Sequence, residues 1–220
     1  MKKILVTKLL LLVFLIAPAI ADEGVWLLPY LKQYNEQIMR DLGLGIPIES
    51  IYNENGPSLM DVVVNVGNAG SGSVVSRLGL VLTNHHVVYD HIQKISSVSN
   101  DYLTEGFWAD GLNKEIPLPG LTVSFLRRII DVTERVGQEM ENPEAPSSSR
   151  LVARNIAREY TEGTHYQGFV ETFYRGALSL LYIYEVFEDV RLVGAPPSSI
   201  GKFGGDTDNF IWPRHTGDFA

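Results

Sequence analysis

The stretch Gly79-Leu80-Val81-Leu82-Thr83-Asn84-His85-His86-Val87-Val88-Tyr89-Asp90 is the strongest structural signal in this chain. An apolar run of strand-forming residues follows Gly79 and stops at Thr83-Asn84, which predicts a buried β-strand over residues 79–82 that ends in a turn. Two histidines come directly after it, at the edge of the expected core. Because an imidazole can be held still there, His85 and His86 are candidates for acid–base chemistry.

Two further strands are expected just before this stretch. Residues 60–66 are rich in β-branched side chains, and residues 67–73 read as a turn-rich link to a second strand at 74–76. Short strands joined by glycine-rich turns favour a β-barrel or sandwich. The fold class we predict is mostly β with helical insertions.

The rest of the chain alternates between helical and strand patterns. Apolar spacing predicts a helix over 23–42, which Gly43 would stop, and a helix or irregular turn over 89–98. The patterns at 132–140 and 149–162 predict two helices, which we interpret as an insertion at about 131–163 between strands. The remaining expected strands are 121–126 with 129–130, 169–174, 178–187 and 190–193, and loops are expected at 106–108, 117–120 and 194–197.

The N-terminus has the pattern of an export signal. Three lysines, the apolar run Leu9 to Ile16 and the small residues of Ala19-Ile20-Ala21 predict a secretory signal peptide over residues 1–21. The alternative is a membrane anchor, but the apolar run is shorter than the roughly 20 residues needed to span a bilayer. We therefore expect export to the periplasm or cell surface, with 22–220 as one domain or part of a larger one and no membrane association after cleavage.

The charge and composition of the remaining 199 residues limit the possible partners. They carry 15 basic and 26 acidic residues, a formal charge of −11, so nucleic acid is not expected as a partner. The chain contains no cysteine, so it can form no disulfide and must be held by its apolar core.

The histidine pair alone leaves three interpretations open. His86 could be a general base if a carboxylate holds its other ring nitrogen. The pair could instead be a hydrogen-bonded structural feature. A third possibility is a metal site formed by His86, Asp90 and His91, although the chain has neither cysteine nor a His-Glu-x-x-His motif. From these residues we expect no metal and no cofactor.

A set of longer motifs resembles one family, the exported bacterial dipeptidyl-peptidases of the serine type. The resemblance covers essentially all of residues 22–220 in one order. The motifs that carry it are Asp22-Glu23-Gly24 with Trp26-Leu27-Leu28, Leu82 to His86, Gly106 to Ala109, Leu121-Thr122-Val123, Asp189 to Val193, Gly201 to Asn209 and Trp212 to Phe219.

The resemblance implies a chymotrypsin-like double barrel with an inserted helical domain, of which this chain would hold the first barrel, incomplete. It implies release of dipeptides from peptides with a free N-terminus, with His86 as general base and Asp218 as triad carboxylate, and His85 in a structural or orienting role. Asn209 matches the residue that helps hold the substrate's α-amino group. Phe210 stands beside it where the family has Trp, a weaker partner for a cation. Homodimers are expected of the longer relatives.

Two departures from the family pattern affect these expectations. The family has cysteines at the places of Gly70 and Val87, and both are absent here. The family's nucleophilic serine lies beyond residue 220, and no Gly-x-Ser-x-Gly or Gly-Asp-Ser-Gly stretch occurs in this chain. We therefore expect an N-terminal fragment of a serine-type dipeptidyl-peptidase, inactive as an isolated 220-residue chain. The alternatives are a non-catalytic protein that binds peptide N-termini and, less favoured, a metal-dependent hydrolase.

Overall fold

The computed structural model describes residues 25–142, 148–200 and 217–220, so the expected signal peptide lies outside the described residues. The chain divides into two compact units, residues 1–48 and 49–220. The described part of the first unit is a helical run of η1 (Leu28–Tyr30), η2 (Leu31–Asn35) and α2 (Glu36–Asp41). It ends before Gly43, whose φ of +104° favours glycine, as the sequence predicts.

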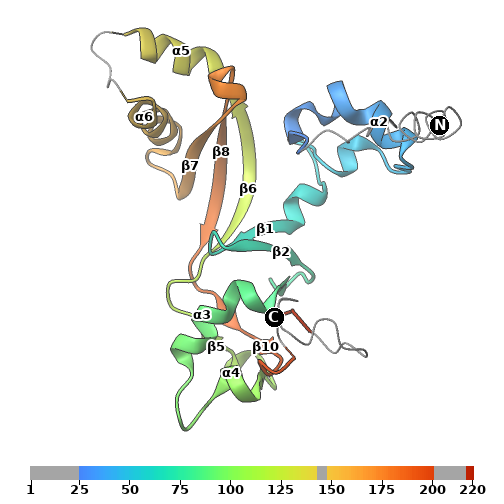
Figure 1. Cartoon of the computed structure of the whole chain (residues 1–220), viewed down its shortest axis with the longest axis vertical. Helices are drawn as coiled ribbons and strands as arrows, with labels where there is room; N and C mark the ends of the chain where they lie inside the picture. The colour runs from blue at the N-terminus through green and yellow to red at the C-terminus, as the bar shows by residue number, and fades with distance from the viewer. Residues whose placement is uncertain (1–24, 143–147, 201–216) are drawn as a thin grey trace, which may run out of the picture. The chain divides into compact units, whose positions relative to one another are not determined.

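The second unit is built on a six-stranded antiparallel sheet with the strand order β3-β2-β1-β6-β8-β7 (Figure 1). The long strands β6, β8 and β7 stand side by side at one end of this order, and the short strands β1, β2 and β3 form the other end. Their bounds are β1 (Val63–Val66), β2 (Gly70–Val74), β3 (Val81–Thr83), β6 (Val123–Asp131), β7 (Tyr166–Phe173) and β8 (Leu178–Phe187).

The first two strands differ from the sequence-based prediction. Residues 59–62 form a 3₁₀ turn, η4 (Leu59–Val62), in which the amide of Ser58 donates to Asp61 Oδ2 at 2.8 Å, so β1 starts at Val63 rather than at residue 60. Most of the glycine-rich segment, expected to be a link, is strand β2, and the turn is confined to residues 67–69, where Gly67 and Asn68 have positive φ. The prediction of a separate strand at 74–76 was therefore wrong.

Strand β3 also lies further along the chain than predicted, and it is not a buried strand. It is the edge of the sheet, and Leu82 at its centre is 50% exposed. The turn expected after it is the start of α3 (His85–Ile95), so both histidines lie in the first turn of a helix.

Helix α3 packs on the short strands to form the first hydrophobic core. Val88 and Ile92 are one helical turn apart and both are buried, together with Val64 and Val66 of β1. The core continues through Leu118, Leu121, Val123, Leu192 and Ala195. It fixes the N-terminal turn of α3 against the end of the sheet that carries β3.

A second core lies at the other end of the sheet, where α5 (Thr133–Glu141) and α6 (Ser149–Thr161) accompany β7 and β8 (Figure 1). Val152 and Ile156 of α6 are buried with Leu181 and Ile183 of β8. Both helices and both strands were predicted from sequence, and the two helices fall within the segment 131–163.

Two short strand pairs complete the described elements of this unit. β4 (Phe107–Trp108) pairs with β10 (Gly194–Ala195), and β5 (Ile116–Pro117) pairs with β9 (Arg191–Leu192). The remaining described helices are η3 (Ile48–Ser50), α4 (Tyr102–Glu105), η5 (Leu112–Lys114) and η6 (Tyr174–Gly176). The mostly β fold with helical insertions is confirmed, but in the described residues the sheets do not close into a barrel.

Candidate active site

The site is a histidine–aspartate pair formed by residues far apart in the sequence. His86 Nδ1 lies 2.7 Å from Asp218 Oδ2. An ionised carboxylate can only accept a hydrogen bond, so the imidazole places its proton on Nδ1 and leaves Nε2 as an acceptor. The His86 side chain is 45% exposed and that of Asp218 only 18%, so the base can be reached while the acid is sheltered.

The short segment 217–220 is attached to the end of β3. Thr83 and Ala220 exchange both backbone hydrogen bonds, at 2.8 and 2.9 Å, as a hydrogen-bonded antiparallel pair does. The side-chain amide of Asn84 donates to the carbonyl oxygen of Asp218 at 2.9 Å. The contacts of Ala220 with Thr83 and of Asp218 with Asn84 thus place Asp218 next to His86.

The N-terminus of α3 supplies the second contact to the acid. The backbone amide of His86 donates to Asp218 Oδ1 at 3.0 Å, so one carboxylate oxygen meets the helix amide and the other meets the ring. Burial opposes ionisation of Asp218, but the hydrogen bonds from the amide and ring of His86 outweigh it and hold the pKa of this carboxyl below its usual value. Asp218 is therefore a carboxylate at neutral pH.

His85 is fully buried, with 0% exposure, and neither of its ring nitrogens has a hydrogen-bond partner among the residues that the structure describes. Its ring meets that of Tyr89 edge-on, with centroids 5.9 Å apart. Burial lowers the pKa of His85, and the nearby negative charge of Asp218 only partly opposes this shift. His85 is therefore a neutral, packed side chain beside the pair.

The expected substrate-binding residues, Asn209 and Phe210, lie outside the described residues. A pair of aromatic side chains does lie next to the histidine–aspartate pair: Trp108 is 63% exposed, and its ring centroid is 6.2 Å from that of Phe219. Gly194 makes this possible, because a Cβ there would lie 2.4 Å from Trp108 Cε3. Neither this contact nor the amide of Asn84 was assigned a role from the sequence.

In the part of the chain that the structure describes, no three His, Cys, Asp or Glu side chains are arranged to hold a metal ion, including the candidates His86, Asp90 and His91. No helix in those same residues is long and apolar enough to cross a membrane.

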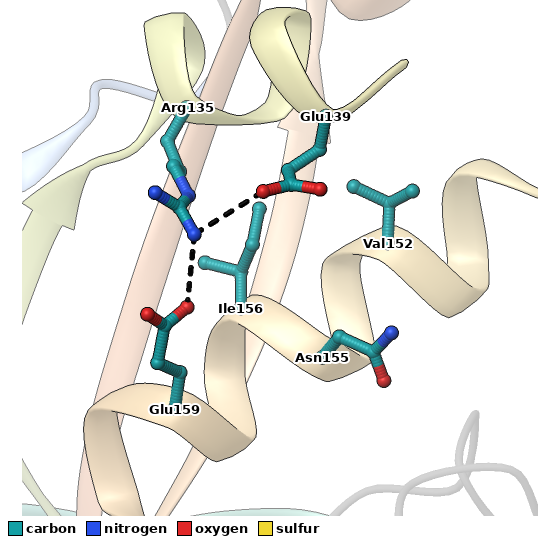
Figure 2. Close-up of a pocket in the computed structure, with 6 residues that line it drawn as sticks. All are labelled: Arg135, Glu139, Val152, Asn155, Ile156 and Glu159. Atoms are coloured by element: carbon teal, nitrogen blue, oxygen red, sulfur yellow. Dashed lines mark hydrogen bonds and ion pairs between the residues drawn. The ribbon is translucent and has the colours of Figure 1, made fainter. Parts of the chain in front are cut away.

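A small pocket between α5 and α6 contains an ionic cluster rather than a reactive group (Figure 2). Arg135 Nη2 lies 3.2 Å from Glu139 of its own helix and 3.2 Å from Glu159 of α6. Both carboxylates point at one guanidinium, with Val152, Asn155 and Ile156 as the other lining residues. None of these residues belongs to the histidine–aspartate pair.

A general base whose Nδ1 is held by a carboxylate is the arrangement that serine peptidases use. The chain belongs to the Peptidase S46 family, whose model matches residues 21–220. It is 44% identical over 204 residues to "Dipeptidyl-peptidase 7" of Porphyromonas gingivalis and 45% identical over 213 residues to the "Asp/Glu-specific dipeptidyl-peptidase" of Porphyromonas endodontalis.

A solved structure of a dipeptidyl-peptidase is also similar to this chain. The chain matches Porphyromonas endodontalis DPP11 in complex with substrate with a TM-score of 0.81 and 44% identity, over 90% of this chain and 30% of that one. The alignments to the two named relatives include 91% and 92% of this chain, but only 29% of each relative. The chain therefore spans about three tenths of the length of the proteins it matches.

Proposed function

We propose that this chain supplies the general base and the acid of a serine-type dipeptidyl-peptidase, which releases dipeptides from the free N-termini of peptides. The observation that carries the proposal is the 2.7 Å contact between His86 Nδ1 and Asp218 Oδ2. The family membership and the names of the relatives give the reaction class.

The geometry supports a role for each of the two residues. Asp218 fixes the tautomer of His86 and stabilises the imidazolium that forms when Nε2 takes a proton. The proton would come from a serine hydroxyl, which we place outside these 220 residues because the chain has no Gly-x-Ser-x-Gly or Gly-Asp-Ser-Gly stretch. The His86 and Asp218 contribution is thus one part of a triad.

We further propose that Asn209 and Phe210 contact the α-amino group of the substrate, that the protein is exported, and that the full-length form is a homodimer. The first point is supported by the match of the 201–209 segment to the family motif, and the second by the composition of residues 1–21. The aromatic ring of Phe210 offers a face to a cation but no N–H donor.

A chimera tests the activity. Residues 22–220 would replace the matching part of the Asp/Glu-specific dipeptidyl-peptidase of Porphyromonas endodontalis, and dipeptide release would be measured. We expect activity in the chimera, a loss of about 10⁶-fold in kcat for His86→Ala and about 10⁴-fold for Asp218→Ala. His165→Gln, on the 67%-exposed histidine before β7, is the matched control.

The proposal fails if the folded chimera releases dipeptides equally well without His86. The 220-residue chain alone is expected to be inactive, and measurable release from it would contradict the assignment of the nucleophile. Binding of peptides to the isolated chain, measured by calorimetry, would separate a binding role from a catalytic one.

A further inference from the structure

Asn84 occupies the N-cap position of α3, yet it does not cap the helix. Its backbone is extended, with φ −86° and ψ 145°, as N-cap residues are, but its side chain accepts no hydrogen bond from the helix amides. Its amide Nδ2 instead donates to the carbonyl oxygen of Asp218 at 2.9 Å. Asparagine is common at N-caps, but here its side chain binds the segment that carries Asp218.

Asp218 caps the helix in place of Asn84. The amide of His86 is at the second position of the helix, one of those that an N-cap side chain normally satisfies, and it donates to Asp218 Oδ1 at 3.0 Å. Asn84 and Asp218 therefore serve each other: the acid caps the helix that Asn84 begins, and Asn84 holds the main chain of the acid.

We propose that Asn84 is a positioning residue that aligns Asp218 with the imidazole of His86. The Thr83–Ala220 pair fixes the main chain two residues beyond the acid, and Asn84 fixes the carbonyl of the acid itself. Without the Asn84 contact, the described hydrogen bonds to Asp218 come only through its carboxylate, which can then tilt away from the ring. The inference rests on the proposed function for its catalytic meaning, but the alignment can be measured without catalysis.

Two substitutions separate positioning from helix capping. Asn84→Ser and Asn84→Asp both place a good N-cap residue at position 84, so neither disfavours the start of α3. The Asp carboxylate has no donor, and the shorter Ser side chain ends one atom before the Nδ2 that donates to the carbonyl of Asp218. Asp also brings a second negative charge close to Asp218, so Asn84→Ser is the cleaner comparison. A role for Asn84 only in starting the helix would leave the His86 tautomer in Asn84→Ser like that of the original chain.

The readout is the tautomer of His86 in the 220-residue chain labelled with ¹⁵N-histidine, measured by two-bond ¹⁵N–¹H NMR at neutral pH. We expect the Nδ1–H form to dominate, and the ratio of Nδ1–H to Nε2–H to fall about three- to tenfold in Asn84→Ser, corresponding to the loss of one hydrogen bond. The fall should be larger in Asn84→Asp and largest in Asp218→Asn. Asn155→Ser, on the exposed side of α6, is the matched control.

Protection of the Ile92 amide from exchange, in the buried part of α3, verifies that each variant folds. An unchanged His86 tautomer in both folded Asn84 variants would overturn the proposal. In the chimera, Asn84→Ser should lower kcat with little change in KM. If the tautomer changes but the unmodified chimera is inactive, the proposed function fails while the positioning role of Asn84 stands.

Discussion

Val87 of α3 fills the space that any side chain at position 70 of β2 would need. A Cβ atom built on Gly70 would lie 2.5 Å from Val87 Cγ2, well inside van der Waals contact. The glycine therefore lets the helix that carries His86 lie directly on the hairpin of β1 and β2.

The first prediction is that Gly70→Ala destabilises the protein. Overpacking at this contact should cost about 1–3 kcal/mol, whereas a clash-free alanine in a strand would be neutral or stabilising. Val87→Ala in the same chain should recover part of the loss, because the shortened side chain frees the space. Urea unfolding of both single variants and the double variant gives the coupling, and strictly additive effects would argue against the contact.

The second prediction concerns a disulfide at the same contact. The ideal Cβ at position 70 lies 3.5 Å from Val87 Cβ, within the range found across disulfides. Gly70→Cys with Val87→Cys should therefore form a bond on oxidation and raise the free energy of unfolding by about 3 kcal/mol. The gain should disappear with reductant. Failure to oxidise would show that the two positions are not in contact.

The third prediction is a loss of stability between neutral and mildly acidic pH. Since the pKa of His85 is lower in the folded chain than the value of about 6.5 in an unfolded one, the unfolded state binds more protons in the interval between the two. Stability should fall as pH drops below about 6.5, and the loss should level off below the folded pKa. His85→Phe should flatten this part of the profile, and Asn155→Ser, which removes no ionisable group, should not.

The fourth prediction applies to stronger acid. Because the pKa of Asp218 is lowered in the folded chain, its contribution is present above the ordinary aspartate value of about 3.9 and is lost as pH falls through the folded pKa. Asp218→Asn should cost about 1.5–3 kcal/mol at pH 7 and reduce the slope of stability below the ordinary aspartate pKa. The exposed Asp110→Asn is the control, and equal acid profiles for the two variants would contradict the hydrogen bonds described.

The fifth prediction concerns the junction of the two cores. The pairing of β6 with β8 shifts register between Leu126 and Arg128, and the intervening Arg127 donates twice to Glu185 of β8, at 2.9 and 2.6 Å. Its guanidinium also lies 5.1 Å from the ring centroid of Phe125. Arg127→Gln should lower the free energy of unfolding by about 0.5–1 kcal/mol, as expected for a partly exposed ion pair. The neighbouring, exposed Arg128→Gln should have a smaller effect in the same thermal or urea measurement.

The sequence predicted best those elements whose own pattern decides their structure. Helix α6 buries Val152 and Ile156, four residues apart, and the helical spacing of such residues is visible in the sequence. The long strands β7 and β8 are likewise rich in aromatic and β-branched residues. Their prediction needed no knowledge of distant contacts.

The errors arose where a distant contact decides the structure. Gly70 and Gly72 look like turn residues, but they lie in strand β2. Glycine is needed there because α3 and β3 approach too closely for side chains. Leu82 looks like a buried residue, but its strand is the sheet edge. The role of Asn84 could not be foreseen, since its partner lies 134 residues away.

The pairing of His86 with Asp218 came from resemblance rather than from spacing, because no local pattern connects residues 132 positions apart. The strand end and the histidines identified half of the site. The acid has no regular structure around it in the described residues and carries no signal of its own in the hydrophobic pattern.

The same separation has a consequence for the order of folding. Closing a loop of 132 residues costs about 4 kcal/mol of chain entropy, but the pairing of β10 with β4 already brings Ala195 back to Phe107. Two shorter spans, from His86 to Phe107 and from Ala195 to Asp218, then remain to be closed. We expect α3 to form before Asp218 caps its first turn. His86 then gains its carboxylate partner only after the two cores have formed.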